Sequence, residues 1–215
     1  NFPFIQYFIG VAGVIGTDFY NFDLEQWGFS RTENESWSHY VERIRNHKVW
    51  NSKNISSWDL SLLGAKEINN YAVADKNVYY FSVSTSITEK NIKNDWHSPK
   101  KGSALLIQAR AKIIGKRVGY WGDGSETDSS WYENDGLVNT ISMSGPKTGD
   151  NGPDLIVEFS EETSRFVPGQ WYSIGPLRID HWNIIGHKMH LKKTDKNSIR
   201  FFKEHASRLM NLTKK

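Results

Sequence analysis

The sequence predicts an α/β fold, because amphipathic helical stretches alternate with a few strand-like ones. Apolar residues recur at helical spacing in 36–47 and 198–212, whereas residues 77–85 (NVYYFSVST) alternate and are rich in β-branched and aromatic side chains. A second strand-like run, 171–180, leads directly to a histidine. With 215 residues, the chain is long enough for one domain with a hydrophobic core.

The first segment, residues 1–17, carries no charged side chain and is rich in apolar ones. It is too short and too often interrupted by glycine for a membrane span. It also lacks the basic residues that begin a signal peptide. The run GVAGVIG at 10–16 does not have the spacing of a GxGxxG motif, so its glycines indicate turns or helix ends rather than a phosphate-binding loop. We expect a buried or lid-like apolar segment here.

Two helices are expected next. In residues 36–47 the apolar side chains at helical spacing are Trp37, Tyr40, Val41 and Ile44. Asp59 is a candidate N-cap for the second helix. Its inward-facing residues would then be Leu60, Leu63, Ile68, Tyr71 and Ala72.

The middle of the chain is less decisive. After the strand at 77–85, residues 102–114 (GSALLIQARAKII) fit either a helix or a strand. Residues 121–130 (WGDGSETDSS) form a polar loop, and its acids Asp123, Glu126 and Asp128 either bind a cation or are simply solvated. Residues 137–143 (LVNTISM) fit a short helix or strand, and the stretch 144–154 is a loop because it is rich in Gly, Pro, Asp and Asn.

The C-terminal part is expected to hold one strand and one helix. Residues 171–180 form the strand that approaches His181. Ser198 begins the last helix. The apolar face of that helix would consist of Ile199, Phe202, Ala206, Leu209 and Met210.

Composition excludes several classes of protein. With 27 basic and 24 acidic side chains and a net charge of +3, the chain is too balanced for a nucleic-acid-binding protein. The absence of cysteine excludes disulfides and thiolate catalysis. Lysines near the C-terminus indicate a solvated basic face or a weak attraction to anionic lipid. Aromatic residues make up 13% of the chain, which fits a large hydrophobic core, an apolar binding groove or a carbohydrate-binding module. A carbohydrate-binding module would consist of strands throughout, and the helical patterns at 36–47 and 198–212 speak against it.

The residues with the clearest chemical potential are Asp135 and His181. The sequence contains no GxSxG, GxxxxGK[ST], HExxH or CxxC motif. Asp135 precedes a glycine after a polar loop, where a carboxylate suits the orienting of a histidine, although an Asx-turn or a helix cap has the same pattern. His181 lies between apolar runs in RIDHWNIIG, which fits a strand-end base or a packed or exposed histidine.

Several segments resemble the secreted lipases of the staphylococcal and Geobacillus type. The segment ENDGLVNTISMSGP at 133–146 is similar to the one that carries their catalytic acid, and DHWNIIG at 180–186 to the one that carries their histidine. The other similar segments follow in the family's order and are NFDLEQWGF at 21–29, ESWSHYVERI at 35–44, VWNSKNISSWDLSLLGAKEIN at 49–69 and VYYFSVST at 78–85. The resemblance therefore covers nearly the whole chain.

The resemblance implies the C-terminal part of an α/β-hydrolase fold, a mostly parallel sheet flanked by helices, over residues 1–215. It also implies hydrolysis of carboxylic esters such as triacylglycerols at an oil–water interface, and secretion. In this family the triad runs Ser, Asp, His along the chain. Asp135 then matches the acid and His181 the base, while residues 1–17 occupy the place of the family's lid.

The family's serine nucleophile and oxyanion loop lie upstream of where this chain starts. We therefore expect either a part of a longer lipase or a catalytically inactive lipase-like protein that binds lipid or a protein partner. The sequence gives no oligomeric state. If these residues are part of a larger fold, strand edges and an apolar sheet face would be exposed in isolation and solubility would be poor.

We expect no metal cofactor. The family's calcium site would use the carbonyl of a glycine matched by Gly102 and acids matched by Asn183 and Lys188, and a lysine ammonium repels calcium. The one zinc-binding aspartate that related thermophilic lipases have in this region is matched by Asn54, a poor zinc ligand.

Overall fold

A computed structural model describes residues 24–146, 156–162, 165–186 and 196–212 of the chain. The chain divides into two compact units, residues 1–65 and 66–215, and the boundary falls within helix α4 (Leu62–Asn69). The predicted lid-like segment 1–17 and residues 147–154 of the predicted loop lie outside the described residues. In the described part of the chain, no helix is both long and apolar enough to cross a membrane.

The first unit consists of short helices. They are η1 (Leu24–Trp27), α2 (Trp37–Arg45), η2 (Lys48–Asn51), α3 (Ser56–Asp59) and the start of α4. Its core is formed by the buried side chains of Phe29, Tyr40 and Ile44, with Trp50 stacked on Phe29 at a ring-centroid distance of 5.7 Å. The predicted helix at 36–47 is therefore confirmed as α2. Ser36 caps α2 by accepting a hydrogen bond from the backbone N–H of His39.

An arginine closes the loop before α2. The Arg43 guanidinium donates to both carboxylate oxygens of Glu35, at 2.8 Å each. It also donates to the backbone carbonyls of Gly28 and Ser30. The hydrogen bond with Arg43 lowers the pKa of Glu35 to about 2.

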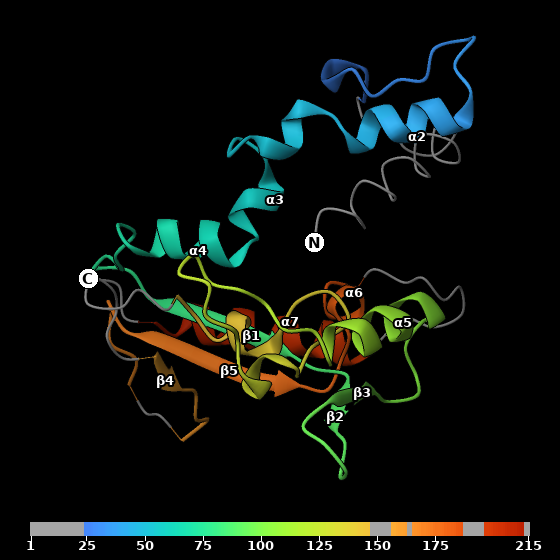
Figure 1. The fold of residues 1–215 in the computed structure, drawn as a ribbon. Coiled ribbons are helices and arrows are strands. Elements are labelled where there is room, and N and C mark those ends of the chain that lie inside the picture. The colour runs from blue at the N-terminus through green and yellow to red at the C-terminus, as the bar shows by residue number, and fades with distance from the viewer. Residues whose placement is uncertain (1–23, 147–155, 163–164, 187–195, 213–215) are drawn as a thin grey trace. The chain divides into compact units, whose positions relative to one another are not determined.

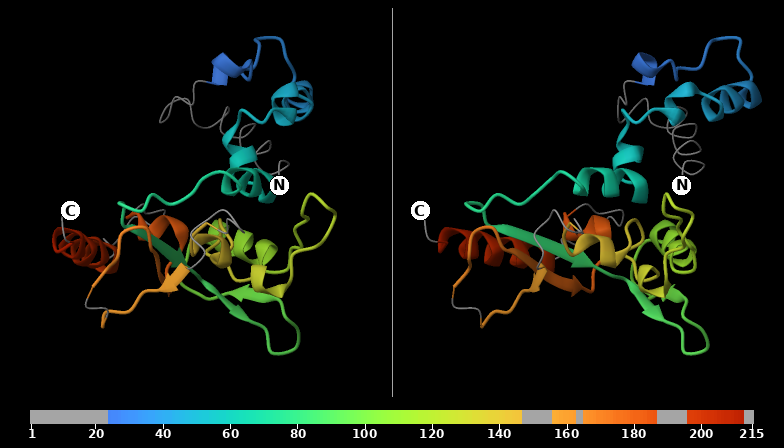
Figure 2. Two further views of the ribbon diagram at one scale, coloured as in Figure 1. Left: turned by 90° about the vertical axis from the view of Figure 1, so that its left-hand side faces the viewer. Right: turned by 60° about the vertical axis from the view of Figure 1, so that its left-hand side comes forward.

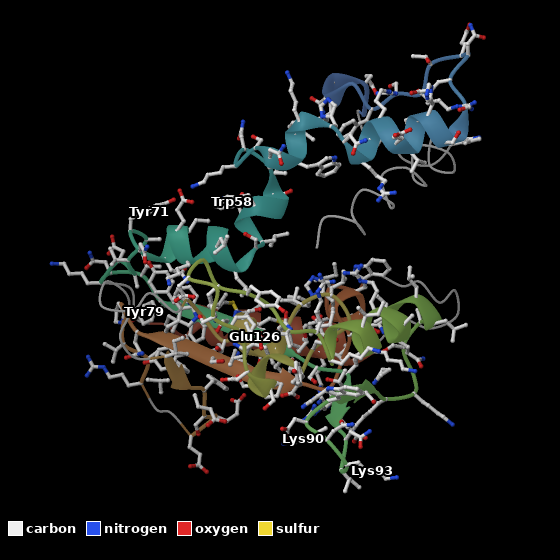
Figure 3. All side chains as sticks on the ribbon, in the orientation of Figure 1. Trp58, Tyr71, Tyr79, Lys90, Lys93 and Glu126 are labelled. Carbon is white, nitrogen blue, oxygen red and sulfur yellow. The ribbon has the colours of Figure 1, made fainter. Side chains whose placement is uncertain are left out.

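The predicted helix capped by Asp59 is wrong. Asp59 is the last residue of α3, and α4 begins separately at Leu62, where the Ser61 hydroxyl accepts a hydrogen bond from the Gly64 N–H. Of the five side chains predicted to face inward, only Ile68 is partly buried. The other four are exposed, and the most exposed are Leu60 at 83% and Tyr71 at 71%, of which Tyr71 is labelled in Figure 3. Since α3 ends at Asp59 and α4 begins at Leu62, one helical periodicity does not run through both.

The second unit is built on a parallel sheet. Its strands are β1 (Tyr80–Thr85), β4 (Ile156–Glu158) and β5 (Trp171–Leu177), in the order β1-β5-β4. β5 lies in the middle and pairs in parallel with both neighbours. A small antiparallel pair, β2 (Thr88–Lys90) and β3 (His97–Pro99), follows β1, and Lys90 and Lys93 lie at its far end (Figure 3). Both predicted strands, 77–85 and 171–180, are confirmed.

The second unit also contains five complete helices within the described residues. They are α5 (Leu105–Ile114), η3 (Ser129–Trp131), η4 (Thr140–Met143), α6 (His181–Ile184) and α7 (Lys196–Met210). The ambiguous stretch 102–114 thus contains a helix, and 137–143 contains a short 3₁₀ helix. The loop 121–130 is confirmed, apart from the first residues of η3 at its end. Helices combined with a parallel sheet make this an α/β fold, as predicted.

The helix α7 packs against the sheet through a different face from the one expected. It lies along the sheet (Figures 1 and 2), and its His205 ring meets Phe81 of β1 edge-on at 5.5 Å. Ser198 is buried, and Phe201 and Arg208 are partly buried on the same face. The side chains predicted to form the buried face are exposed, namely Ile199, Phe202, Ala206, Leu209 and Met210. The expectation that α7 begins at Ser198 is also wrong, because it begins at Lys196.

A compact apolar cluster lies at the carboxyl end of the sheet. The ends of β1 and β5 point toward α5 and α6 (Figure 1). There Ile87, Ala104, Ile107 and Ala111 are buried together, and Leu137 and Trp182 pack against them. Since Leu137 follows Asp135 by two positions and Trp182 follows His181 directly, this cluster brings the two segments of interest to the same end of the sheet.

Candidate active site

The histidine is placed by a helix start. β5 ends at Leu177, and the buried carboxylate of Asp180 caps α6 by accepting from the backbone N–H groups of Trp182 and Asn183, at 3.1 and 2.8 Å. Asp180 also accepts from the Asn183 side-chain amide at 2.7 Å. These bonds make His181 the first residue of α6, with an imidazole that is 39% exposed.

Asp135 is placed by a tight loop that is held by its neighbours Asn134 and Gly136. The buried side chain of Asn134 donates to the backbone carbonyls of Ala111 and Tyr132, and its oxygen accepts from the N–H of Gly136. Gly136 has a φ of +94°, and a Cβ there would lie 2.5 Å from Cγ2 of Ile107. Only glycine fits this turn without displacing the α5 core.

The two predicted residues meet. Nδ1 of His181 lies 2.8 Å from Oδ2 of Asp135, and the His181 backbone N–H donates to the Asp135 carbonyl at 3.4 Å. The Asp135 carboxylate is completely buried, while the imidazole reaches the surface. Because the described partners of the carboxylate are all donors, Nδ1 carries the hydrogen of this bond, which leaves the other ring nitrogen free to accept a proton.

Three further donors converge on the carboxylate. Oδ1 accepts from the backbone N–H groups of Leu137 and Val138 at 3.0 and 2.9 Å. Oδ2 accepts from the Thr85 hydroxyl at 2.7 Å, in addition to His181. Burial by itself would raise the pKa of Asp135, but the hydrogen bond with His181, together with those from Thr85, Val138 and Leu137, outweighs it and holds the pKa below its ordinary value.

The electrostatics of the histidine follow from the same contact. The hydrogen bond to Asp135 raises the pKa of His181, partial burial opposes this effect, and the negative charges of Asp135 and Asp180 add to it. A buried carboxylate that stays ionised beside a half-exposed imidazole is an arrangement in which the imidazole can take up a proton and be stabilised as imidazolium.

The positions compared with metal sites show no cluster of ligands. Within the described ranges, no three His, Asp, Glu or Cys side chains lie close enough to hold a metal ion. The Asn183 amide donates to Asp180, and Asp123 accepts from Ser125 within its own loop. Gly102 has a φ of +126° and Asn54 is exposed, while Lys188 lies outside the described residues.

Comparison with known proteins identifies the family. The model of the lipase-like C-terminal domain matches residues 7–215. The chain belongs to this family. The resemblance to staphylococcal lipases predicted from the sequence is therefore confirmed, and the lipase-like domain carries Asp135 and His181 in hydrogen-bond contact at one end of its sheet.

Individual relatives agree. The lipase-like domain is 29% identical over 176 residues to Lipase 2 of Staphylococcus aureus (strain MRSA252), which covers 80% of this chain and 23% of that protein. It is 27% identical over 168 residues to Lipase 1 of Staphylococcus aureus (strain NCTC 8325 / PS 47), which covers 77% of this chain and 22% of that protein.

Solved structures show the same fold. EstA from Clostridium botulinum is 33% identical with a TM-score of 0.73, over 99% of this chain and 49% of that chain. Staphylococcus hyicus lipase is 25% identical with a TM-score of 0.65, over 97% and 49%. Lipase 1 from Pelosinus fermentans is 28% identical with a TM-score of 0.65, over 97% and 53%. The lipase-like domain thus spans about a quarter of these curated relatives and about half of these solved structures.

Two residues of the site were missed from the sequence. Thr85 donates to the acid, and Asp180 caps the helix that carries the base. A signal existed for both. Thr85 ends a strand that was predicted correctly, and parallel strands bring their carboxyl ends to one edge of the sheet. Asp180 immediately precedes the histidine, in the position typical of an N-cap.

Proposed function

We propose that this chain is the C-terminal part of an α/β-hydrolase that hydrolyses carboxylic esters, with Asp135 as the orienting acid and His181 as the general base. The observation that carries the proposal is the 2.8 Å contact between Nδ1 of His181 and Oδ2 of Asp135. Membership of the lipase-like family and the likeness to lipases support the reaction class.

In the proposed mechanism, a serine outside these 215 residues supplies the nucleophile. Its oxygen attacks the ester carbonyl carbon while His181 takes the hydroxyl proton, and the imidazolium is stabilised by Asp135. His181 then gives this proton to the departing alcohol as the acyl–oxygen bond breaks. A water molecule attacks the acyl-serine in the second half of the cycle, again with His181 as the base.

The second unit offers surfaces that a further part of the protein would cover. Among the described strands, β1 pairs on one side only, with β5. The stripe on α7 that includes Ile199, Phe202 and Met210 is exposed. β4 likewise pairs only with β5, so both edges of the described sheet are unpaired. Unpaired strand edges and an apolar helix face favour association. We therefore expect the whole protein to unfold cooperatively and residues 1–215 alone to aggregate, and a sharp, reversible melt of 1–215 as a monomer would contradict this.

The proposed substrates are acyl esters such as triacylglycerols at an oil–water interface, and the proposed location is outside the cell. Residues 1–17 are proposed as a lid, because an uncharged apolar segment is best covered in water and exposed at a lipid surface. Polar substitutions at Phe4 and Phe8 should then lower hydrolysis of an emulsion more than hydrolysis of a dissolved ester. An equal effect on hydrolysis of the emulsion and of the dissolved ester would contradict the proposal that residues 1–17 form a lid.

Neither calcium nor zinc takes part in the proposed reaction. The positions matched to metal ligands carry Asn54, Asn183 and Lys188, which are poor ligands or cationic. Hydrolysis by the whole protein should therefore be unchanged after treatment with a chelator. A loss that is restored by added calcium or zinc would contradict this part.

The test uses the whole protein and a fluorophosphonate, which forms a covalent bond with an activated serine. We expect label on one serine outside residues 1–215, and we expect His181→Gln and Asp135→Asn to abolish labelling and to lower ester hydrolysis about 10⁴-fold. The exposed His39 on α2 gives a matched control, since His39→Gln should leave both unchanged. Label on a serine within 1–215, or none on any serine of a folded protein, would reject the mechanism, and the latter result would favour a lipid- or protein-binding role.

A further inference from the structure

The strand β1 contributes a side chain to the acid–base pair. Thr85, the last residue of β1, is 2% exposed, and its hydroxyl oxygen lies 2.7 Å from Oδ2 of Asp135. The same oxygen accepts from Nδ1 of His181 at 2.8 Å. Thr85 and His181 therefore bind one atom of the carboxylate from two different segments.

The direction of the Thr85 bond can be assigned. A threonine hydroxyl has one hydrogen to donate. Its two candidate acceptors are the carboxylate oxygen at 2.7 Å and the sulfur of Met143 at 3.4 Å. A charged oxygen at the shorter distance is much the stronger acceptor, so the hydroxyl donates to Asp135.

The position of Thr85 is fixed by two neighbouring segments, the end of β5 and η4. Its Cα is paired with that of Leu177 at the end of β5, after an irregularity in register between Val83 and Thr85. The next residue, Ser86, donates its N–H to the Leu177 carbonyl at 2.9 Å. The hydroxyl of Thr140 donates to the Thr85 carbonyl at 2.8 Å. The hydroxyl is thus held in place before any substrate binds.

A hydroxyl that donates to Oδ2 reduces the negative charge with which the carboxylate stabilises the imidazolium. Each donor withdraws some negative charge from the oxygen that accepts it, and two donors on one oxygen compete for that charge. Because the two backbone N–H groups of Leu137 and Val138 already hold Oδ1, the carboxylate keeps its orientation when the hydroxyl is removed. The main effect of the hydroxyl is therefore on charge.

We propose that Thr85 is a positioning residue that sets the basicity of His181, by holding part of the Asp135 charge on Oδ2 through its hydroxyl. The proposal rests on the function proposed above, in which His181 is the base. Among the residues that the structure describes, the charged groups that act on His181 are Asp135 and Asp180, and neither of them is altered by substituting Thr85. A change in the pKa of His181 would then be due to the loss of the Thr85 hydroxyl.

The experiment measures the pKa of His181 by NMR in the whole protein labelled with ¹³C at histidine Cε1. The signal of His181 is assigned by its loss in His181→Gln. In Thr85→Val, which keeps the shape of the side chain but has no hydroxyl, the pKa of His181 should rise above that of the unmodified protein. Thr85→Ser should restore the original value.

The matched control is Ser84→Ala. Ser84 precedes Thr85 on β1 and is also buried, but its hydroxyl donates to the Ile174 carbonyl at 3.3 Å. This variant should leave the pKa of His181 unchanged. If Thr85→Val does not fold, Thr85→Cys takes its place, because a thiol is a weak donor and should give an intermediate rise.

A pKa of His181 that is unchanged or lowered in a folded Thr85→Val or Thr85→Cys variant would overturn the proposal. The NMR result does not depend on ester hydrolysis, so failure of the proposed function is seen separately, as absence of activity in the unmodified protein. In the active protein, the acidic limb of the kcat/KM profile should move to higher pH in Thr85→Val, with KM nearly constant. A purely structural role of Thr85 would move neither the pKa nor this limb.

Discussion

Replacing Gly136 with alanine tests how the acid is held against the core. Gly136 follows Asp135 directly and has a φ of +94°, which costs an L-residue about 1–2 kcal/mol. The new Cβ would lie 2.5 Å from Cγ2 of Ile107, about 0.9 Å short of the 3.4 Å at which ordinary contact begins. Because Ile107 is fully buried in the α5 cluster, it cannot move aside freely.

The expected loss of stability is the sum of these two effects. Overpacking of a filled core costs about 1–3 kcal/mol, so Gly136→Ala should lower the free energy of unfolding by about 2–5 kcal/mol. Gly124 provides a matched control, since its φ is +85° and a Cβ there would meet nothing within 4 Å. Gly124→Ala should therefore cost only the backbone share, about 1–2 kcal/mol.

The assay is urea unfolding of the whole protein, followed by tryptophan fluorescence. A second background separates the two contributions, because Ile107→Ala removes the Cγ2 atom that lies 2.5 Å from the new Cβ, while the Ile107 carbonyl oxygen at 3.1 Å stays. In that background, Gly136→Ala should cost less than in the native background, at most about 1 kcal/mol more than Gly124→Ala. If Gly136→Ala and Gly124→Ala cost the same within about 0.5 kcal/mol in the native background, the steric argument is refuted.

Three further predictions concern titratable groups. Asp135→Asn should lower the pKa of His181, because an amide does not stabilise the imidazolium, and an unchanged NMR titration would contradict this. Folding lowers the pKa of Asp135, so the stability from this group is complete above the ordinary value of about 3.9 and is lost as the pH falls through the folded pKa. Folding raises the pKa of His181, so the stability from this group is complete below about 6.5 and is lost as the pH rises through the folded pKa. The difference in unfolding free energy between the native protein and His181→Gln should thus be largest between about pH 4 and 6.5, and no dependence on pH would refute the coupling. Arg43→Lys removes the bidentate contact with Glu35, so the pKa of Glu35 should rise from about 2 toward 4.5. A carboxyl ¹³C titration that still gives a pKa of about 2 would show that Arg43 does not cause the lowered pKa.

Local patterns predicted much of the secondary structure and one pair of residues. The alternation in 77–85 and the helical spacing in 36–47 correspond to β1 and α2, because each depends only on which side chains face the same way along a short segment. Asp135 and His181 were singled out by their surroundings in the sequence and by the family resemblance. Their separation of 46 positions gave no information on distance, and only folding brought Nδ1 within 2.8 Å of Oδ2.

Tertiary contacts decided the rest. The periodicity of α7 favours the stripe with Phe202 and Met210 as the buried face. The sheet takes the face with Phe201 and His205 instead, where the His205 ring stacks on Phe201 and meets Phe81 of β1 edge-on. The partnership of Thr85 with Asp135 depends on which strands are neighbours and on their register, and neither is set within one segment. The sequence by itself thus determined which chemical groups are available. The packing of distant segments determined which of them share a hydrogen bond, since a hydrogen bond requires a separation that chain distance does not specify.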